Sequence, residues 1–158
     1  MRFFYSFVLL TISIFSYSQN TNQTLNFINQ TLKENNPRDF VGEDYFVVLE
    51  EDGSFILVRT HKDDLFNTQK INIDDFSKVS FYSVRNEYYV QLHCKNDRLC
   101  VYSKYFGSTA DLSRPKSELS IQTTDDRTAN KLAAAIIHLF KINSNINPTQ
   151  PTKIKNKK

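Results

Sequence analysis

The chain has 158 residues, a formal net charge of +3 at pH 7, three glycines, two cysteines and no tryptophan. This length suits a single domain with a hydrophobic core, and so few glycines leave little material for glycine-rich phosphate-binding loops. Much of the positive charge lies in the C-terminal tail, so a broad nucleic-acid-binding surface is not expected.

Residues 1–18 have the order of a secretory signal peptide. Arg2 gives the positively charged N-terminal region of such a signal, and residues 3–15 form its mostly apolar region. The small residues Ser16 and Ser18 then precede a cleavage site before Gln19. The apolar run is too short for a comfortable membrane span, so we expect export and no transmembrane span in the mature chain. The alternatives are an uncleaved anchor or a buried first helix. This signal, in a chain rich in Asn, Lys, Ile and Phe, resembles exported proteins of Bacteroidota.

The mature chain is expected to begin with a helix and a hairpin. The helix covers residues 20–36, with an apolar stripe of Leu25, Ile28 and Leu32, and Pro37 ends it. The hairpin covers residues 44–61, with Asp52-Gly53 as a two-residue turn. This turn predicts pairs Leu49–Ile56 and Val47–Val58 on one face, and leaves Phe46, Val48, Phe55 and Leu57 on the other. Both faces therefore need cover, and the first helix is the natural cover for one.

The middle of the chain predicts further strands. Residues 61–68 read as a polar connection, residues 70–73 as a short strand and Asp74-Asp75 as a turn. A second hairpin around Arg85-Asn86 joins residues 78–84 to residues 87–94 and pairs Phe81 with Val90 and Val79 with Leu92. Residues 99–105 return as the next strand, with Leu99 opposite Cys94 and Val101 opposite Leu92, and residues 106–117 form a loop.

A short strand with Leu119 and Ile121 leads into a long amphipathic helix that closes the domain. Thr124, Asp125 and Asp126 supply the cap and the first-turn negative charge. The apolar face contains Ala129, Leu132, Ala133, Ile136, Leu139 and Phe140, and the opposite face contains Arg127, Lys131, Ala134, His138 and Lys141. Residues 144–158 carry two prolines and four lysines without periodicity and predict a disordered tail. The sequence thus predicts one α+β domain over residues 19–143, with about seven antiparallel strands in a small barrel or bent sheet between two helices.

Seven short strands followed by a closing helix resemble the pleckstrin-homology-like barrel over residues 44–142. The resemblance rests on this element order, on residues 70–76 leading into Val79, and on the strand-to-helix join at Thr124-Asp125. It implies a scaffold that binds peptides, proteins or lipids. Family members that bind inositol phosphates carry basic residues around the first hairpin, whereas this tip reads Glu50-Glu51-Asp52-Gly53. No phosphoinositide ligand is therefore expected.

Cys94 and Cys100 are the two cysteines. In an exported chain this spacing favours a disulfide, which adds about 2.4 kcal/mol in the chain-entropy model. The strand pattern opposes direct pairing, because Leu99 opposite Cys94 turns Cys100 to the other face with Tyr102 and Lys104. A bulge near the tip reconciles the two. The alternative is one buried and one exposed thiol.

The sequence contains no recognisable catalytic motif, so we expect no enzyme and no cofactor. Neither His93 with Cys94 and Cys100 nor His61 with Asp63 and Asp64 has the spacing of a zinc site, and no metal is expected. Aromatic residues gather near the second hairpin, and alternation places Tyr89 and Tyr102 on one outer face. Such side chains suit partner binding, although cross-strand packing is the alternative explanation.

The sequence predicts an exported, non-enzymatic binding or protein-interaction module of the cell envelope, whose partner is an envelope protein or a small ligand. The alternative is a small carrier that holds an apolar ligand in the barrel interior or under the first helix. An envelope hydrolase is a third class, with no supporting motif. A carrier requires an apolar cavity, whereas an interaction module requires a filled core and an exposed aromatic surface.

We expect the mature protein to begin at Gln19 and to be found outside the cytoplasm, because residues 1–18 have the charged, apolar and small-residue order of a cleaved signal. Intact-mass spectrometry of protein purified from the native host measures this directly. A mass that includes Met1 would contradict the prediction.

Overall fold

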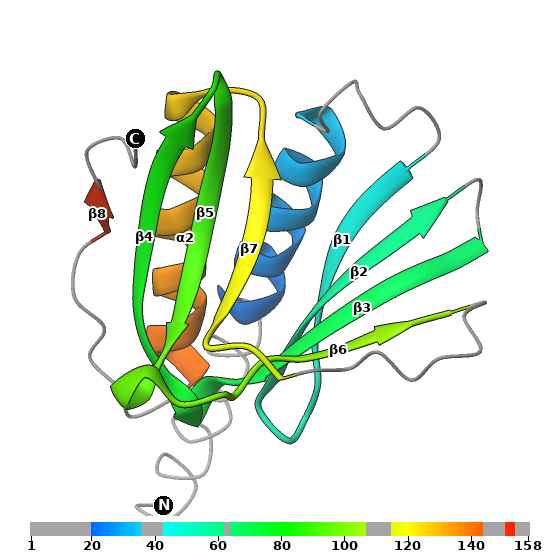
Figure 1. Cartoon of the computed structure of the whole chain (residues 1–158), viewed down its shortest axis with the longest axis vertical. Helices are drawn as coiled ribbons and strands as arrows, with labels where there is room; N and C mark the ends of the chain where they lie inside the picture. Colours follow the sequence, from blue (N-terminus) through cyan, green and yellow to red (C-terminus); the bar gives the residue numbers. More distant parts are fainter. Residues whose placement is uncertain (1–19, 36–42, 62–63, 107–114, 144–150, 154–158) are drawn as a thin grey trace, which may run out of the picture.

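The computed structural model describes residues 20–35, 43–61, 64–106, 115–143 and 151–153 (Figure 1). The first sheet contains, in spatial order, β1 (Glu43–Leu49), β2 (Ser54–His61), β3 (Asp64–Asn72) and β6 (Tyr102–Tyr105). The second sheet contains, in spatial order, β7 (Glu118–Thr123), β5 (Glu87–Cys94), β4 (Phe76–Val84) and β8 (Thr152–Lys153). The helices are an N-terminal helix over residues 20–34 and α2 (Asp126–Asn143). The predicted signal segment, residues 1–18, lies outside the described residues.

The predicted α+β fold is confirmed, with seven antiparallel strands in two sheets between an N-terminal and a C-terminal helix. The described strands do not close into a barrel, because β1 and β7 end their sheets without pairing with each other. The two sheets diverge from one corner, with α2 behind β4 and β5 and the N-terminal helix between β7 and β1 (Figure 1). The bent-sheet form of the prediction therefore holds.

The chain passes between the sheets at that corner. β3 continues through the 3₁₀ turn η1 (Ile73–Asp75) into β4, and β5 continues through η2 (Lys95–Asp97) toward β6. Asn72 accepts a hydrogen bond from the Asp74 backbone N–H at 2.9 Å, which caps η1 at the predicted Asp74-Asp75 turn. β3 begins earlier than predicted, at Asp64, since pairing with β2 overrides the weak strand preference of its polar residues.

The first hairpin forms in a register one residue away from the prediction. Leu49 pairs with Phe55 and Val47 with Leu57, so the predicted pairs Leu49–Ile56 and Val47–Val58 are wrong. The turn is longer than two residues: Gly53 has φ +78° and donates its N–H to Glu50 O, and Glu50 donates to Ser54 O. This shift turns Phe55 and Leu57 into the core and moves Ile56 and Val58 to the outer face, where Val58 is still only 7% exposed.

The second hairpin has its predicted register, with Phe81 opposite Val90 and Val79 opposite Leu92. Arg85 and Asn86 both have positive φ, as a two-residue hairpin turn of this type requires. The predicted return of residues 99–105 onto this hairpin is wrong, because β5 pairs with β7 and β6 pairs with β3. Positive φ at Asn96 and Asp97 turns the chain toward the first sheet, and Leu99 remains 60% exposed.

α2 closes the core as predicted. Asp125 caps it by accepting the Thr128 N–H at 2.9 Å, and the hydrogen bonds from Thr128 hold the pKa of the Asp125 carboxyl below its usual value. The residues expected on the buried face are all fully buried: Ala129, Leu132, Ala133, Ile136, Leu139 and Phe140. The residues expected on the opposite face are all exposed: Arg127, Lys131, Ala134, His138 and Lys141.

The N-terminal helix buries Ile28 and Leu32 and protects the edge of the first sheet. The Asn29 side chain donates to the Val47 carbonyl at 3.0 Å and accepts the Val47 N–H at 2.7 Å. One amide thus satisfies both backbone groups of an edge residue, a place where other chains tend to pair. The predicted cover of one hairpin face by this helix agrees with these contacts.

The C-terminal segment differs from the predicted disordered tail at one place. Thr152 and Lys153 form β8, which pairs in parallel with Ser80 and Phe81 of β4. Apart from Pro151, the rest of the predicted tail lies outside the described residues. The second sheet therefore ends in a short strand from the chain terminus.

Replacing Leu132 with Asp should unfold the domain, because it places a charge among side chains with no solvent access, at a cost of several kcal/mol. Arg127→Ala, on the exposed face of the same helix, is the control and should be nearly silent. Thermal melting compares them. A Leu132→Asp variant that melts like the parent would contradict the role of α2 as the closing element.

Candidate functional site

The outer face of the first sheet carries a set of side chains that strand pairing brings together. Two neighbouring rows cross the four strands, one of Val48, Ile56, Lys70 and Tyr102 and one of Phe46, Val58, Thr68 and Lys104. Alternate residues of a strand point to the same face, so these eight side chains share one surface. We call this surface the outer patch.

Three large side chains of the outer patch are open to solvent. Tyr102 is 60% exposed, and Phe46 and Val48 are each 38% exposed. The apolar residues lie on β1 and β2, whereas the cations Lys70 and Lys104 lie on β3 and β6. Phe46 and Val48 lie at one edge of the sheet and Tyr102 at the other, on the same face. Exposed apolar side chains that gather on one face often mark an interaction site.

The two cations of the outer patch have different surroundings. Lys70 Nζ lies 2.9 Å from Glu50 Oε2 and 3.3 Å from Asp52 Oδ2. The hydrogen bond that Lys70 donates to Glu50 is the main cause that raises the pKa of Lys70. Lys104 Nζ lies 4.9 Å from the centre of the Phe106 ring. The charge of Lys70 is therefore partly balanced by the hairpin tip, and that of Lys104 is set against an aromatic face.

The predicted binding residues Tyr89 and Tyr102 lie in different sheets. Tyr102 belongs to the outer patch, but Tyr89 lies on β5, where its ring stacks on Tyr82 with centroids 5.4 Å apart. Burial and the hydrogen bond that Tyr89 donates to Glu87 at 2.6 Å raise the pKa of Tyr89 to about 12. The proposed aromatic strip through both residues is therefore wrong, because β5 and β6 are not neighbours. Tyr102 lies opposite Lys70 of β3, in the same row as Ile56 of β2 and Val48 of β1, an arrangement that only the sheet order reveals.

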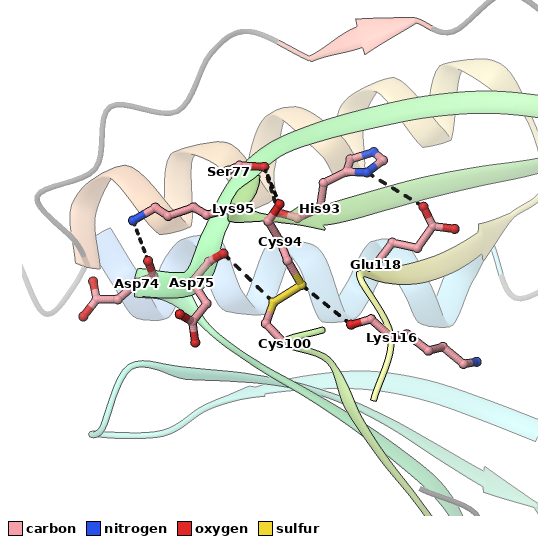
Figure 2. Close-up of a disulfide and its surroundings, with 9 residues drawn as sticks. All are labelled: Asp74, Asp75, Ser77, His93, Cys94, Lys95, Cys100, Lys116 and Glu118. Atoms are coloured by element: carbon pink, nitrogen blue, oxygen red, sulfur yellow. Dashed lines mark hydrogen bonds and ion pairs between the residues drawn. A yellow bond between two sulfur atoms is a disulfide. The ribbon is translucent and has the colours of Figure 1, made fainter. Parts of the chain in front are cut away.

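Cys94 and Cys100 form a disulfide at the corner between the sheets, with Cα atoms 5.9 Å apart (Figure 2). Both residues are buried, so the alternative of one buried and one exposed thiol is wrong. The sulfur atoms face the carbonyl oxygens of Asp75 and Lys116, and Lys95 donates to Asp74 O at 2.6 Å. The bond thus holds the end of β5 close to η1 and to the chain segment that enters β7.

This corner adjoins the outer patch. A hollow of about 260 Å³ is lined by Asp75, Lys95, Asn96, Arg98, Leu99, Cys100 and Tyr102. Leu99 is as exposed as Tyr102, at 60%. Leu99 therefore adds one exposed apolar side chain beside Tyr102, in a hollow that is otherwise lined mainly by polar and charged residues.

Ser80, His93 and Glu118 come together on the second sheet from three strands, a grouping without a signal in the sequence. Ser80 Oγ lies 2.7 Å from His93 Nε2, and His93 Nδ1 lies 3.8 Å from Glu118 Oε2. Acyl transfer by such a group requires a nucleophile that substrate can reach and donors for the oxyanion. Ser80 is only 1% exposed and lies inside β4, so this arrangement orients the imidazole rather than presenting a nucleophile.

The far end of the inner face of the first sheet is polar. Asn67 and Ser103 are 0% and 3% exposed, and their side-chain polar atoms have no hydrogen-bond partner among the described residues. Buried polar groups of this kind disfavour an apolar ligand, because such a ligand leaves them unsatisfied. The sequence predicted that Asn67 belongs to a polar connection, whereas in the structure Asn67 is buried in β3.

Other classes of site find little support in the described part of the chain. No group of three or more His, Cys, Asp or Glu side chains there is arranged to hold a metal ion. Each helix that the structure describes is too short or too polar to span a membrane. No protein-family model matches the chain, and no curated protein or solved structure is significantly similar to it. The resemblance to the pleckstrin-homology-like barrel therefore stays a prediction.

The two tyrosines should respond differently to replacement by Ser. Tyr102→Ser should change the free energy of unfolding by less than about 1 kcal/mol, because the ring is largely exposed. Tyr89→Ser should cost about 1–2 kcal/mol, since it removes a stacked ring and a hydrogen bond. Urea unfolding measures both. Equal losses for the two variants would contradict the assignment of Tyr102 to an open surface.

Proposed function

We propose that this protein is an exported, non-enzymatic interaction module of the cell envelope that binds a partner protein through the outer patch. The observation that carries the proposal is the joint exposure of Phe46, Val48 and Tyr102 on one sheet face. Exposed aromatic and apolar side chains with a polar surround are typical of protein-binding surfaces. Lys70, which lies between Ile56 and Tyr102 in its row, and Lys104 on β6 supply polar groups next to these side chains.

Export is the second part of the proposal. It rests on the signal-like order of residues 1–18 and on the Cys94–Cys100 disulfide, since disulfides persist mainly in oxidising compartments. A binding role outside the cytoplasm agrees with both features.

The carrier alternative has weaker support. The inner residues Val47, Phe55, Leu57 and Ile71 are at most 1% exposed, as in a filled core. A hollow of about 380 Å³ between the N-terminal helix and β1 is lined by Asn29, Gln30, Lys33, Asp44, Tyr45 and Phe46. This hollow is open to solvent and its rim carries the exposed polar residues Gln30, Lys33 and Asp44, so it does not enclose an apolar ligand as a carrier cavity does.

The test compares the full-length parent with two full-length variants in capture experiments from an envelope extract of the native host. Val48→Ser with Tyr102→Ser should lose a partner that the parent retains, because both replacements remove contact area from the outer patch. Phe27→Ser is the matched control: Phe27 is 47% exposed on the N-terminal helix and lies outside the patch. The partner identified in this way is then purified, and its affinity for each variant is measured by calorimetry.

We expect the patch variant to bind the purified partner about tenfold or more weakly than the parent, and Phe27→Ser to bind like the parent. Unfolding curves of all three proteins confirm that the fold is retained. A partner that binds the patch variant and the parent equally would contradict the proposal.

A further inference from the structure

The exposed face of α2 carries a row of cations. Residues three and four positions apart share one side of a helix, and this side of α2 is formed by the exposed residues Arg127, Lys131, Ala134, His138 and Lys141. From Arg127 to Lys141 the row is about 21 Å long, at about 1.5 Å per residue. The one acidic residue of α2, Asp126, lies in the first turn, where it suits the helix dipole. The row itself therefore presents one sign of charge to solvent.

Neighbouring side chains do not neutralise this row. In the described part of the chain, the carboxylates in close contact with a basic side chain face Lys70 and His93, and none faces a cation of α2. On the side of the N-terminal helix, His138 Nε2 lies 3.1 Å from Asn20 Oδ1, and Gln23 is exposed one turn further along that helix. The row is thus bordered on this side by uncharged amides, which form hydrogen bonds but cancel no charge.

The row is hollowed in the C-terminal half of α2. A hollow of about 180 Å³ is lined by Ala134, Ile137, His138 and Lys141 of α2 and by Pro151. Ala134 is the small side chain of the row, so the surface is lower there than at the longer side chains on either side. Ala134, Ile137 and Pro151 are apolar, whereas the imidazole and the ammonium group are polar. A ligand that fits this hollow combines an apolar face with polar or acidic groups.

Two common occupants of a basic helix face fit this surface poorly. A basic amphipathic helix binds a membrane by inserting its apolar face, but the apolar face of α2, with Leu132, Ile136 and Phe140, is buried in the core. A protein interface has an apolar centre, whereas the apolar area of this row is confined to the small hollow. A long basic row with one small hollow suits instead a narrow, linear chain of repeated acidic units.

We propose that the exposed face of α2 binds an acidic polysaccharide, with one sugar unit in the hollow and further units along the row. A sugar ring has an apolar C–H face and a rim of hydroxyl groups, which match the apolar and polar parts of the hollow. Its carboxylate accepts a charge-assisted hydrogen bond from Lys141, and Arg127 and Lys131 contact carboxylates further along the chain. Simultaneous binding of several units raises the affinity above that of a single sugar. The site does not include the outer patch, so its test is independent of the function proposed above.

Short chains of alginate, a polysaccharide with a carboxylate on every sugar, test the site. Calorimetry measures their binding to the full mature chain, with the neutral polysaccharide dextran as the comparison. We expect alginate to bind and dextran not to bind. Added salt should weaken the binding of alginate, because the contacts join exposed charges.

Two double variants with equal changes of net charge locate the binding surface. Lys131→Gln with Lys141→Gln should weaken alginate binding about tenfold or more, because both replacements remove a charged contact from the row. Lys33→Gln with Lys116→Gln is the matched control: both residues are exposed and lie outside α2, so this variant should bind like the parent. Unfolding curves check that both variants retain the fold.

A third variant separates a saccharide site from general attraction between charges. Ala134→Leu fills the hollow and keeps every charge, and the fold should tolerate it because Ala134 is exposed and leucine favours helices. This variant should bind alginate about tenfold more weakly than the parent, because the sugar unit no longer fits the hollow. Poly-L-glutamate has the same sign of charge without sugar rings. It should bind the parent more weakly than alginate does, and Ala134→Leu should not change its binding.

Four results would overturn the proposal. The first is that alginate does not bind the parent. The second is an equal loss of alginate binding in the two double variants. The third is that poly-L-glutamate binds as tightly as alginate and that Ala134→Leu changes neither, which would mean that charge alone is recognised. The fourth is tighter binding to phosphatidylglycerol vesicles than to alginate, weakened by the same pair of α2 replacements, which would make a membrane the occupant.

Discussion

The ring of Phe140 is the contact on which the arrangement of the two sheets depends. It meets Phe55 of the first sheet with centroids 5.3 Å apart and Phe76 at the start of β4 with centroids 4.6 Å apart, both edge to face. All three residues have no solvent access. Each such pair contributes about 0.5–1.5 kcal/mol beyond the burial of its area. Because α2 holds Phe140 in place, the helix sets the position of one sheet relative to the other.

The disulfide corner imposes the second constraint. Cys94 ends β5 and Cys100 precedes β6, so the chain leaves the second sheet and enters the first within a few residues. β5 therefore pairs with β7, a strand that follows much later in the chain. This exchange of neighbours puts Tyr102 on the first sheet, opposite Lys70 of β3, rather than beside Tyr89.

The outer faces of the two sheets differ in character, and this difference defines the candidate site. On the second sheet, Ser80 and Gln91 are polar and nearly buried, and Tyr82 and Tyr89 stack on each other. On the first sheet, apolar side chains of β1 remain open to solvent next to lysines of β3 and β6. Covering a face that exposes apolar area with a partner gives a more favourable free energy of binding than covering a polar face does. The outer patch is therefore the better candidate for a protein contact.

Local patterns in the sequence predicted the parts of this structure that local forces control. The helical spacing of Leu132, Ile136 and Phe140 determined the buried face of α2, and Arg85-Asn86 determined the register of the second hairpin. The spacing of the two cysteines also indicated their bond, although not the corner that it holds. In each case the interacting residues lie within a few positions of each other, so one segment contains the whole signal.

The parts that the sequence could not determine depend on contacts between distant segments. The predicted register of the first hairpin was wrong by one residue, because Asp52-Gly53 is compatible with turns of two lengths and both strand faces are apolar. The outer patch joins β1 and β2 to β6, which lies more than forty residues along the chain, and β8, which follows α2 in the chain, pairs with β4. Composition and periodicity by themselves determined that this chain forms helices and strands with one core. Only the tertiary structure decided which strands are neighbours, because side-chain alternation specifies the face of a strand but not the strand beside it.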